Sequence, residues 1–155
     1  MLDLYEEFRL LIGALDEHKV DYALCGGMAM AVYDRPRTTI DIDLLILSES
    51  FEHVRNIAAS LDYTIRGLDM TFAGGAIEIR RVSKVHRESG KLLSLDLLLV
   101  TPAIQGVWDA RMQAEWEGGE LSVVSRYGLI ELKKLRGSLQ DQADISALEE
   151  DMDDA

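Results

Sequence analysis

The chain has 155 residues, of which 48% are hydrophobic and 28% charged, the composition of a single globular domain. Its formal net charge of −12 argues against a broad polyanion-binding surface, because nonspecific nucleic-acid affinity comes chiefly from Lys and Arg neutralising phosphates. No apolar run approaches the ~20 residues that cross a bilayer, and the first residues lack the pattern of a signal peptide, so we expect a cytoplasmic protein without membrane contact.

The sequence predicts both helices and strands along the chain. Apolar residues at amphipathic spacing predict helices, and apolar runs bounded by turn residues predict strands. In chain order we expect a helix over 2–18, strands over 20–25 and 39–47, a helix over 48–61, short strands over 63–66, 69–73 and 76–82, a strand over 92–100, a helix over 101–114, a strand over 121–124, and helices over 125–136 and from 139. A short helix starting near Met28 follows the first strand, and Gly74-Gly75 forms a hairpin turn. Residues 1–148 are expected to form one domain, followed by an acidic tail over 149–155.

The stretch from residue 24 to residue 47 carries the main motif. Gly26-Gly27 ends the first strand, and Asp41 and Asp43 lie in the second. Successive side chains of a strand alternate between faces, so both carboxylates project from one side of the sheet. Such like charges are unfavourable unless water, protonation or a cation intervenes, and a hard divalent cation with oxygen ligands is the usual remedy.

Asp96 is the only charged residue in the apolar strand 92–100. A buried, unpaired carboxylate is costly, so something should compensate it. If this strand pairs beside the strand 39–47, three carboxylates converge and can hold one or two divalent ions, as in-line phosphoryl or nucleotidyl transfer requires. Gly26-Gly27 leaves backbone amides uncovered at a helix start, where they favour a phosphate.

These motifs resemble a known family. Gly26-Gly27, Asp41-Ile42-Asp43-Leu44 and Leu95-Asp96-Leu97, in this order and spacing, resemble the three-part signature of the DNA polymerase β-type nucleotidyltransferase superfamily. Within it, the chain resembles the small bacterial AbiEii-like nucleotidyltransferases associated with toxin–antitoxin and phage-defence systems. The segments 129–133 and 141–145 resemble the Lys and Asp-x-x-Asp helices of that group.

The resemblance implies an α/β (α+β) fold, a mixed β-sheet flanked by helices. It also implies that Asp41 and Asp43 are ligands to two Mg²⁺ ions. Asp96 would be a ligand to the catalytic Mg²⁺ and would activate the attacking hydroxyl. Gly26 and Gly27 would face the triphosphate of the NTP substrate.

The resemblance also assigns roles to two basic side chains and to a residue beside one of them. Arg37 and Lys133 would neutralise phosphate charge, and we expect both at the surface of the cleft. Asp141 would orient Lys133. The chain has Ser138 where the group often has an Arg just before the Asp-x-x-Asp motif.

Two classes of function follow. The first is a Mg²⁺-dependent enzyme that moves an NMP from an NTP to a hydroxyl of tRNA, a protein or a small molecule, with an antitoxin as a possible protein partner. The alternative is a catalytically weak or inactive module of the same fold that binds a nucleotide or a partner. The carboxylate triad favours the enzyme, because a pure binding module has no need to maintain a costly Asp96. A metal-dependent hydrolase ranks last, because the chain lacks a His-rich ligand set.

The remaining candidates for chemistry have simpler interpretations. The single cysteine, Cys25, excludes an intramolecular disulfide and a cysteine-based zinc cluster. Arg80-Arg81 and the basic run over 84–87 indicate a solvated hairpin edge rather than an RNA-binding track.

Overall fold

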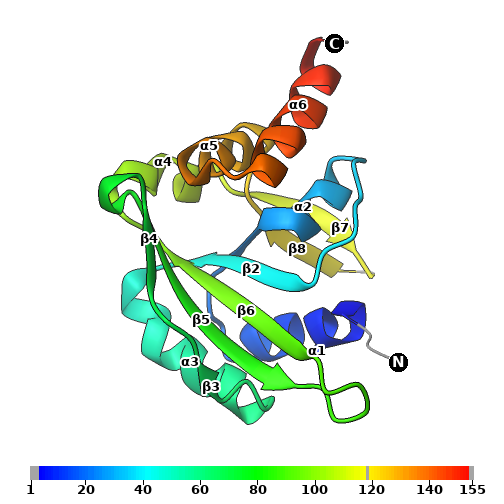
Figure 1. Cartoon of the computed structure of the whole chain (residues 1–155), viewed down its shortest axis with the longest axis vertical. Helices are drawn as coiled ribbons and strands as arrows, with labels where there is room; N and C mark the ends of the chain where they lie inside the picture. The colour runs from blue at the N-terminus through cyan, green and yellow to red at the C-terminus, as the bar shows by residue number, and fades with distance from the viewer. Residues whose placement is uncertain (1–3, 118, 154–155) are drawn as a thin grey trace.

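The computed structural model describes residues 4–117 and 119–153, and these form one mixed sheet with helices on both sides (Figure 1). The strands are β1 (Ala23–Cys25), β2 (Asp41–Ile46), β3 (Ile65–Arg66), β4 (Met70–Phe72), β5 (Ile77–Val85), β6 (Leu92–Leu99), β7 (Met112–Trp116) and β8 (Gly119–Val123). The helices are α1 (Leu4–Glu17), α2 (Gly26–Val32), α3 (Phe51–Ser60), α4 (Gln105–Asp109), α5 (Arg126–Arg136) and α6 (Leu139–Asp153). Short 3-10 turns cover Ser48–Ser50, Ala73–Gly75 and Pro102–Ile104.

The sheet mixes parallel and antiparallel pairing. Its order is β3-β5-β6-β2-β1-β8-β7, with β4 paired to β5. Strand β2 runs parallel to β6 and β1 runs parallel to β8, whereas β1 with β2, β5 with β6, and β7 with β8 are antiparallel. The expected mixed sheet flanked by helices is therefore confirmed.

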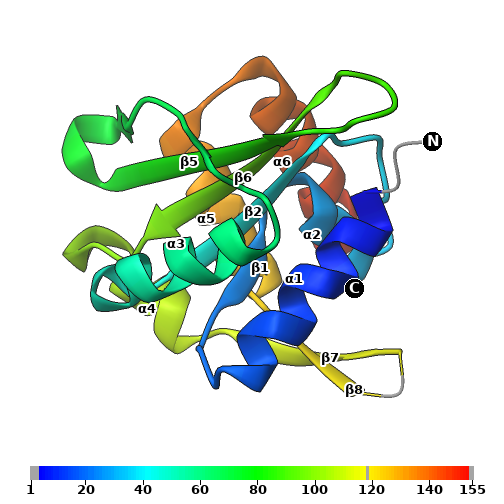
Figure 2. The ribbon, with the colours of Figure 1, turned by 90° about the horizontal axis from the view of Figure 1, so that it is seen from below.

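The helices form two layers around the central strands. Figure 2 shows α1 and α3 side by side across one face of the sheet, with α5 and α6 on the other side. The amphipathic spacing of α1 places Phe8, Leu11, Ile12 and Leu15 in the core, as the sequence predicts. In β6 all residues except Leu92 are buried, so this strand lies at the centre of the core.

One predicted helix is wrong in its second half. The helix expected over 101–114 ends with α4 at Asp109, and the chain then forms β7, which pairs with β8 as a hairpin. From Gln113 to Trp116 the burial alternates with a period of two, since Ala114 and Trp116 are partly buried while Gln113 and Glu115 are exposed. Trp116 packs against Phe8 of α1 with ring centroids 5.4 Å apart, and this contact lies beyond the reach of a helical continuation.

The last helix is longer than expected. Residues 149–153, which the sequence indicated as part of an acidic tail, continue α6, and residues 154–155 lie outside the described residues. Leu148 is fully buried, and Glu149 lies 3.9 Å from the ammonium of Lys134 on α5, so packing and charge both favour continuation of the helix. In the part of the chain that the structure describes, no helix is long and apolar enough to span a membrane.

Candidate active site

The three acidic residues lie on one face of adjacent strands. In the parallel register of β2 and β6, Asp43 is directly opposite Asp96, and Asp41 is opposite Ser94. The expectation that the strand of Asp96 pairs beside the strand of Asp41 and Asp43 is thus confirmed. Because paired residues share a face, all three carboxylates project from the same side of the sheet.

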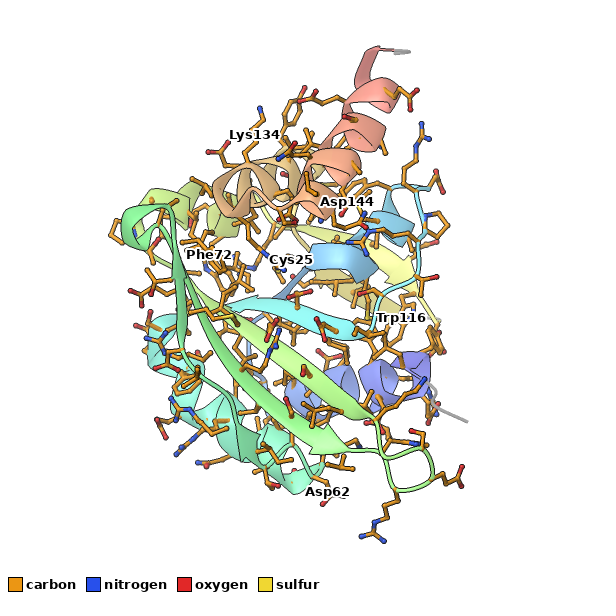
Figure 3. The ribbon with its side chains drawn as sticks, viewed as in Figure 1. Cys25, Asp62, Phe72, Trp116, Lys134 and Asp144 are labelled. Carbon is orange, nitrogen blue, oxygen red and sulfur yellow. The ribbon has the colours of Figure 1, made fainter. Side chains whose placement is uncertain are left out.

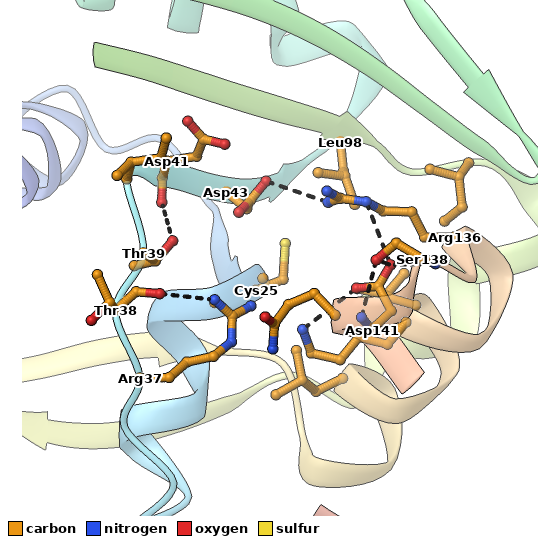
Figure 4. Close-up of a pocket in the computed structure, with 18 residues that line it drawn as sticks. Cys25, Arg37, Thr38, Thr39, Asp41, Asp43, Leu98, Arg136, Ser138 and Asp141 are labelled. Atoms are coloured by element: carbon orange, nitrogen blue, oxygen red, sulfur yellow. Dashed lines mark hydrogen bonds and ion pairs between the residues drawn. The ribbon is translucent and has the colours of Figure 1, made fainter. Parts of the chain in front are cut away.

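Asp43 is buried and poorly compensated. Its Oδ1 is inaccessible and accepts no hydrogen bond from the described residues, and the closest guanidinium, that of Arg136, is 3.9 Å away (Figure 4). Burial, followed by the charge of Asp96, raises the pKa of Asp43 to about 7. Gly26 closes the other side, since its φ of +67° favours glycine and a Cβ there would overlap Asp43 Oδ2. Asp43 therefore has a buried carboxylate oxygen that a ligand from outside the chain could satisfy.

The raised pKa of Asp43 predicts how stability depends on pH. A carboxyl with a raised folded-state pKa contributes stability that is complete below its ordinary pKa and is lost as the pH rises through the folded-state value. We expect the ligand-free protein to lose up to about 4 kcal/mol of unfolding free energy from this group between about pH 4 and pH 8. Asp43→Asn should flatten that dependence in thermal melts followed by circular dichroism. Parallel melting profiles for the parent and Asp43→Asn across this range would contradict the assignment.

Asp96 is compensated by an arginine that the sequence analysis placed elsewhere. Arg81 of β5 donates from Nε to Asp96 Oδ1 at 2.7 Å and from Nη2 to Oδ2 at 2.9 Å. The Asp96 side chain is only 2% exposed, whereas that of Arg81 is 34% exposed. The interpretation of Arg81 as part of a solvated hairpin edge is therefore wrong. The signal that could have found it is the antiparallel register of β5 and β6, which sets Arg81 opposite Asp96.

A cavity of about 270 Å³ opens beside the carboxylates. Asp41 and Asp43 line it together with Gly26 and Gly27, which begin α2. A Cβ on Gly27 would lie 2.9 Å from Thr39 Oγ1 and 3.0 Å from a guanidinium nitrogen of Arg37, so glycine is what the close approach of these groups requires. The Gly-Gly turn, Asp41 and Asp43 thus share one cavity, whereas Asp96 is not among the residues that line it.

Lys133 and Arg37 converge on a single carboxylate. Lys133 Nζ donates to Asp144 Oδ2 at 2.8 Å, and Arg37 donates to both Asp144 oxygens at 2.8 Å. Burial alone would raise the pKa of Asp144, but the hydrogen bonds from Arg37 and Lys133 outweigh it and lower that pKa. Lys133 lines the cavity, as expected, but it is only 4% exposed, so the expectation that it lies at the surface and not in the core is wrong: its charge is neutralised inside the protein. Arg37, at 27% exposed, stays at the margin of the cavity.

Asp141 has a second role besides facing Lys133. Its Oδ1 lies 3.8 Å from Lys133 Nζ, while its Oδ2 accepts hydrogen bonds from the backbone and hydroxyl of Ser138. The Ser138 hydroxyl in turn accepts from the Asp141 backbone amide, which is the reciprocal pattern of a helix capping box. Ser138, where the resembling group often has an Arg, therefore caps α6. Asp144 is the closer partner of Lys133, and the Asp-x-x-Asp spacing was the signal for it.

The carboxylates could hold a hard divalent cation only if Asp96 exchanged its present partner, Arg81. All three side chains offer oxygen, which Mg²⁺ prefers, and Asp43 Oδ1 accepts no hydrogen bond from the described residues. Within 4–117 and 119–153, however, no three His, Cys, Asp or Glu side chains are gathered closely enough to hold an ion. Arg81 occupies both oxygens of Asp96, so the fit requires that Asp96 exchange this partner.

Family comparison places the chain among the nucleotidyltransferases. The model of one family, described as the nucleotidyl transferase AbiEii toxin of a type IV toxin–antitoxin system, matches residues 9–112, which is more than half of the chain. The match places the protein in the nucleotidyltransferase class. Within that class, it belongs to the AbiEii toxin family. No curated protein matches the chain in sequence.

Solved structures share its fold at low sequence identity. A putative nucleotidyltransferase from Thermotoga maritima has a TM-score of 0.58 and 15% identity, covering 99% of this chain and 97% of that one. The lincosamide antibiotic adenylyltransferase LnuA, bound to lincomycin, has a TM-score of 0.60 and 16% identity, covering 96% and 97%. The antibiotic-resistance factor ANT(2'')-Ia has a TM-score of 0.57 and 17% identity, covering 91% and 80%. At these identities the likeness shows the fold alone.

Proposed function

We propose that this protein is a divalent-metal-dependent enzyme that moves an NMP from an NTP to a hydroxyl acceptor. One observation carries the proposal: Asp43 and Asp96 are directly opposite on β2 and β6, and a buried Asp43 oxygen without a hydrogen bond from the described residues lies beside the cavity that Gly26-Gly27 lines. Its membership of the AbiEii family supports the same reaction class and an antitoxin as a protein partner.

The proposed reaction exchanges one phosphoanhydride bond for one phosphoester bond. The acceptor oxygen attacks the α-phosphorus, the bond to the bridging oxygen of the β-phosphate breaks, and pyrophosphate leaves. Asp96 would receive the hydroxyl proton once Arg81 no longer occupies both of its oxygens. One or two Mg²⁺ ions held by Asp41, Asp43 and Asp96 would neutralise phosphate charge and favour ionisation of the hydroxyl.

The other cavity residues hold the triphosphate. Gly26 and Gly27 line the cavity, and the Arg37 guanidinium packs against Gly27, so a phosphate bound there would meet that guanidinium. Arg37 and Lys133 now share Asp144, and a triphosphate entering the cavity would compete with that carboxylate for them.

The acceptor is a hydroxyl of tRNA, a protein or a small molecule. One structural neighbour, ANT(2'')-Ia, has been solved in complex with adenylyl-2''-tobramycin, which makes a small molecule one of the acceptors to test. We propose a cytoplasmic setting for the reaction, because the family belongs to a toxin–antitoxin system.

A binding module with little turnover is the second candidate. The observation in its favour is that the charged groups of the site already satisfy one another, Arg81 with Asp96 and Lys133 with Asp144. A ligand would have to break these pairs before chemistry.

Labelled substrate separates the two candidates. The protein is incubated with Mg²⁺, each α-labelled NTP in turn, and total tRNA, purified protein or a small-molecule extract. The enzyme predicts label on one acceptor fraction and an equal amount of pyrophosphate, both absent in Asp43→Asn. Nucleotide binding without pyrophosphate release in every fraction would favour the binding module.

A further inference from the structure

Arg81 occupies both carboxylate oxygens of Asp96, which are the atoms that would have to bind a metal ion. It lies directly opposite Asp96 in the β5–β6 register, on the same sheet face as the other two carboxylates. Its two hydrogen bonds of 2.7 and 2.9 Å use one oxygen of Asp96 each. Paired in this way, Asp96 has no oxygen that is free of a cationic partner.

The chain is built to hold Arg81 there. The Gly67 amide donates to the Arg81 carbonyl at 2.9 Å. A Cβ at position 67 would lie 3.1 Å from both Cβ and Cγ of Arg81, so the aliphatic part of the Arg81 side chain packs closely against the backbone of Gly67. The guanidinium is thereby directed along the strand pair toward Asp96.

Of the two residues in this ion pair, Arg81 is the one that has room to move away. Asp96 is buried in the central strand, whereas about a third of the Arg81 side chain is exposed. Asp41 Oδ2 is 3.9 Å from Arg81 Nη2, so a second carboxylate is within a short movement of the guanidinium. An exchange of partners would therefore move the arginine and leave the sheet in place.

We propose that Arg81 is a positioning residue that acts as a displaceable counter-ion for Asp96, and that binding of the divalent cation requires this ion pair to open. The inference rests on the proposed metal-dependent function. The two hydrogen bonds hold the Asp96 carboxylate in one orientation beside the Arg81 guanidinium. Opening the Arg81–Asp96 ion pair costs free energy, and this cost lowers the metal affinity, because only the open state offers both oxygens of Asp96 to a metal ion.

Metal binding without nucleotide measures this competition directly. Mn²⁺ affinity of the full chain is determined by electron paramagnetic resonance of the free ion, for the parent, Arg81→Gln and Arg81→Lys. We expect Arg81→Gln to bind Mn²⁺ on the order of tenfold more tightly, a modest gain because the guanidinium is partly solvent-screened. Arg81→Lys, which keeps the charge but loses the two-point geometry, should lie between the two.

Arg80 is the matched control. It is the neighbour of Arg81 in β5, points to the opposite face, and lies 3.3 Å from Glu78 and 3.5 Å from Asp69. Arg80→Gln should leave the Mn²⁺ affinity unchanged. An affinity of Arg81→Gln equal to or weaker than that of the parent would overturn the inference, as would an equal gain in Arg80→Gln.

Thermal stability gives a second measurement. Arg81→Gln should melt below the parent without metal, because Asp96 is then buried without a cation, and Mn²⁺ should raise its melting temperature by more than that of the parent. Adding Asp96→Asn should restore metal-free stability and abolish the extra metal effect. If Arg81→Gln does not fold, the comparison of Arg81→Lys with the parent decides, and an unchanged affinity there counts against the inference.

These results also separate the inference from the proposed function. A parent that transfers NMP while Arg81→Gln gains no affinity overturns the inference alone. Absence of Mn²⁺ binding in the parent and in every variant overturns the inference together with the metal-dependent function.

Discussion

Lys133→Ala is expected to lower the free energy of unfolding by about 3 kcal/mol, and the neighbouring Lys134→Ala by less than about 0.5 kcal/mol. Lys133 is buried between Asp144 and Asp141, at 2.8 and 3.8 Å from the two carboxylates. Loss of the ammonium leaves both carboxylates buried with fewer partners, and Arg37 limits the damage at Asp144. Lys134 is 57% exposed and points away from the body of the protein in Figure 3, so its removal costs little.

Urea unfolding followed by circular dichroism measures both losses. Similar values for the two variants would mean that the buried ion pairs contribute no more than a surface charge. The result also bears on activity, because a destabilised Lys133→Ala cannot report on nucleotide use alone. Arg37→Ala is the better probe of phosphate neutralisation, since Arg37 is more exposed than Lys133.

Asp43→Asn and Asp96→Asn should each reduce NMP transfer by at least about 10³-fold, or roughly 4 kcal/mol of transition-state stabilisation. The two losses should arise at different steps. Asp43 offers an oxygen without a hydrogen bond from the described residues beside the cavity, so the change to Asn should impair binding of the metal-nucleotide itself. Asp96 lies one strand further on, so Asp96→Asn should retain nucleotide binding and fail in the chemical step.

Titration calorimetry with Mg²⁺ and a non-hydrolysable NTP, combined with single-turnover transfer, separates these steps. Asp69→Asn is the control, because Asp69 is half-exposed and contacts only surface arginines among its described ion pairs. Both site variants should remain folded, since asparagine has the shape of aspartate and Arg81 can reach water. Parental transfer rates in both would lead us to abandon the enzyme in favour of the binding module.

The sequence predicted the carboxylate arrangement because strand periodicity is a local property. Alternation over 39–47 and 92–100 determines which face each aspartate occupies, and only the pairing of the two strands had to be assumed. The partner of Asp96 could not be found in this way. Arg81 meets Asp96 through a hairpin register that depends on the length of the 86–91 connection, and adjacent Arg80 has the same local pattern but the opposite face.

The burial of Lys133 and the β7–β8 hairpin were missed for a related reason. Lysine near a helix end is ordinarily solvated, and only the return of α6 across α5 brings Asp144 to its ammonium. The segment 112–116 is compatible with helical spacing, and the contact of Trp116 with α1, more than 100 residues away in sequence, favours the strand. Tertiary contacts thus decided the features that local patterns left open.

The register between β2 and β6 also constrains how this protein can diverge. Backbone hydrogen bonds pair six consecutive residues of the two strands, so Asp43 and Asp96 stay opposite each other only while neither strand gains or loses a residue. A single insertion upstream of Asp96 within β6 would turn its carboxylate into the apolar core. The 86–91 connection and the 3-10 turn at Ala73–Gly75 lie outside this ladder and can change in length without shifting it. We therefore expect relatives that act on different acceptors to differ in the length of their connecting segments, while the spacing within the two acid-bearing strands stays fixed.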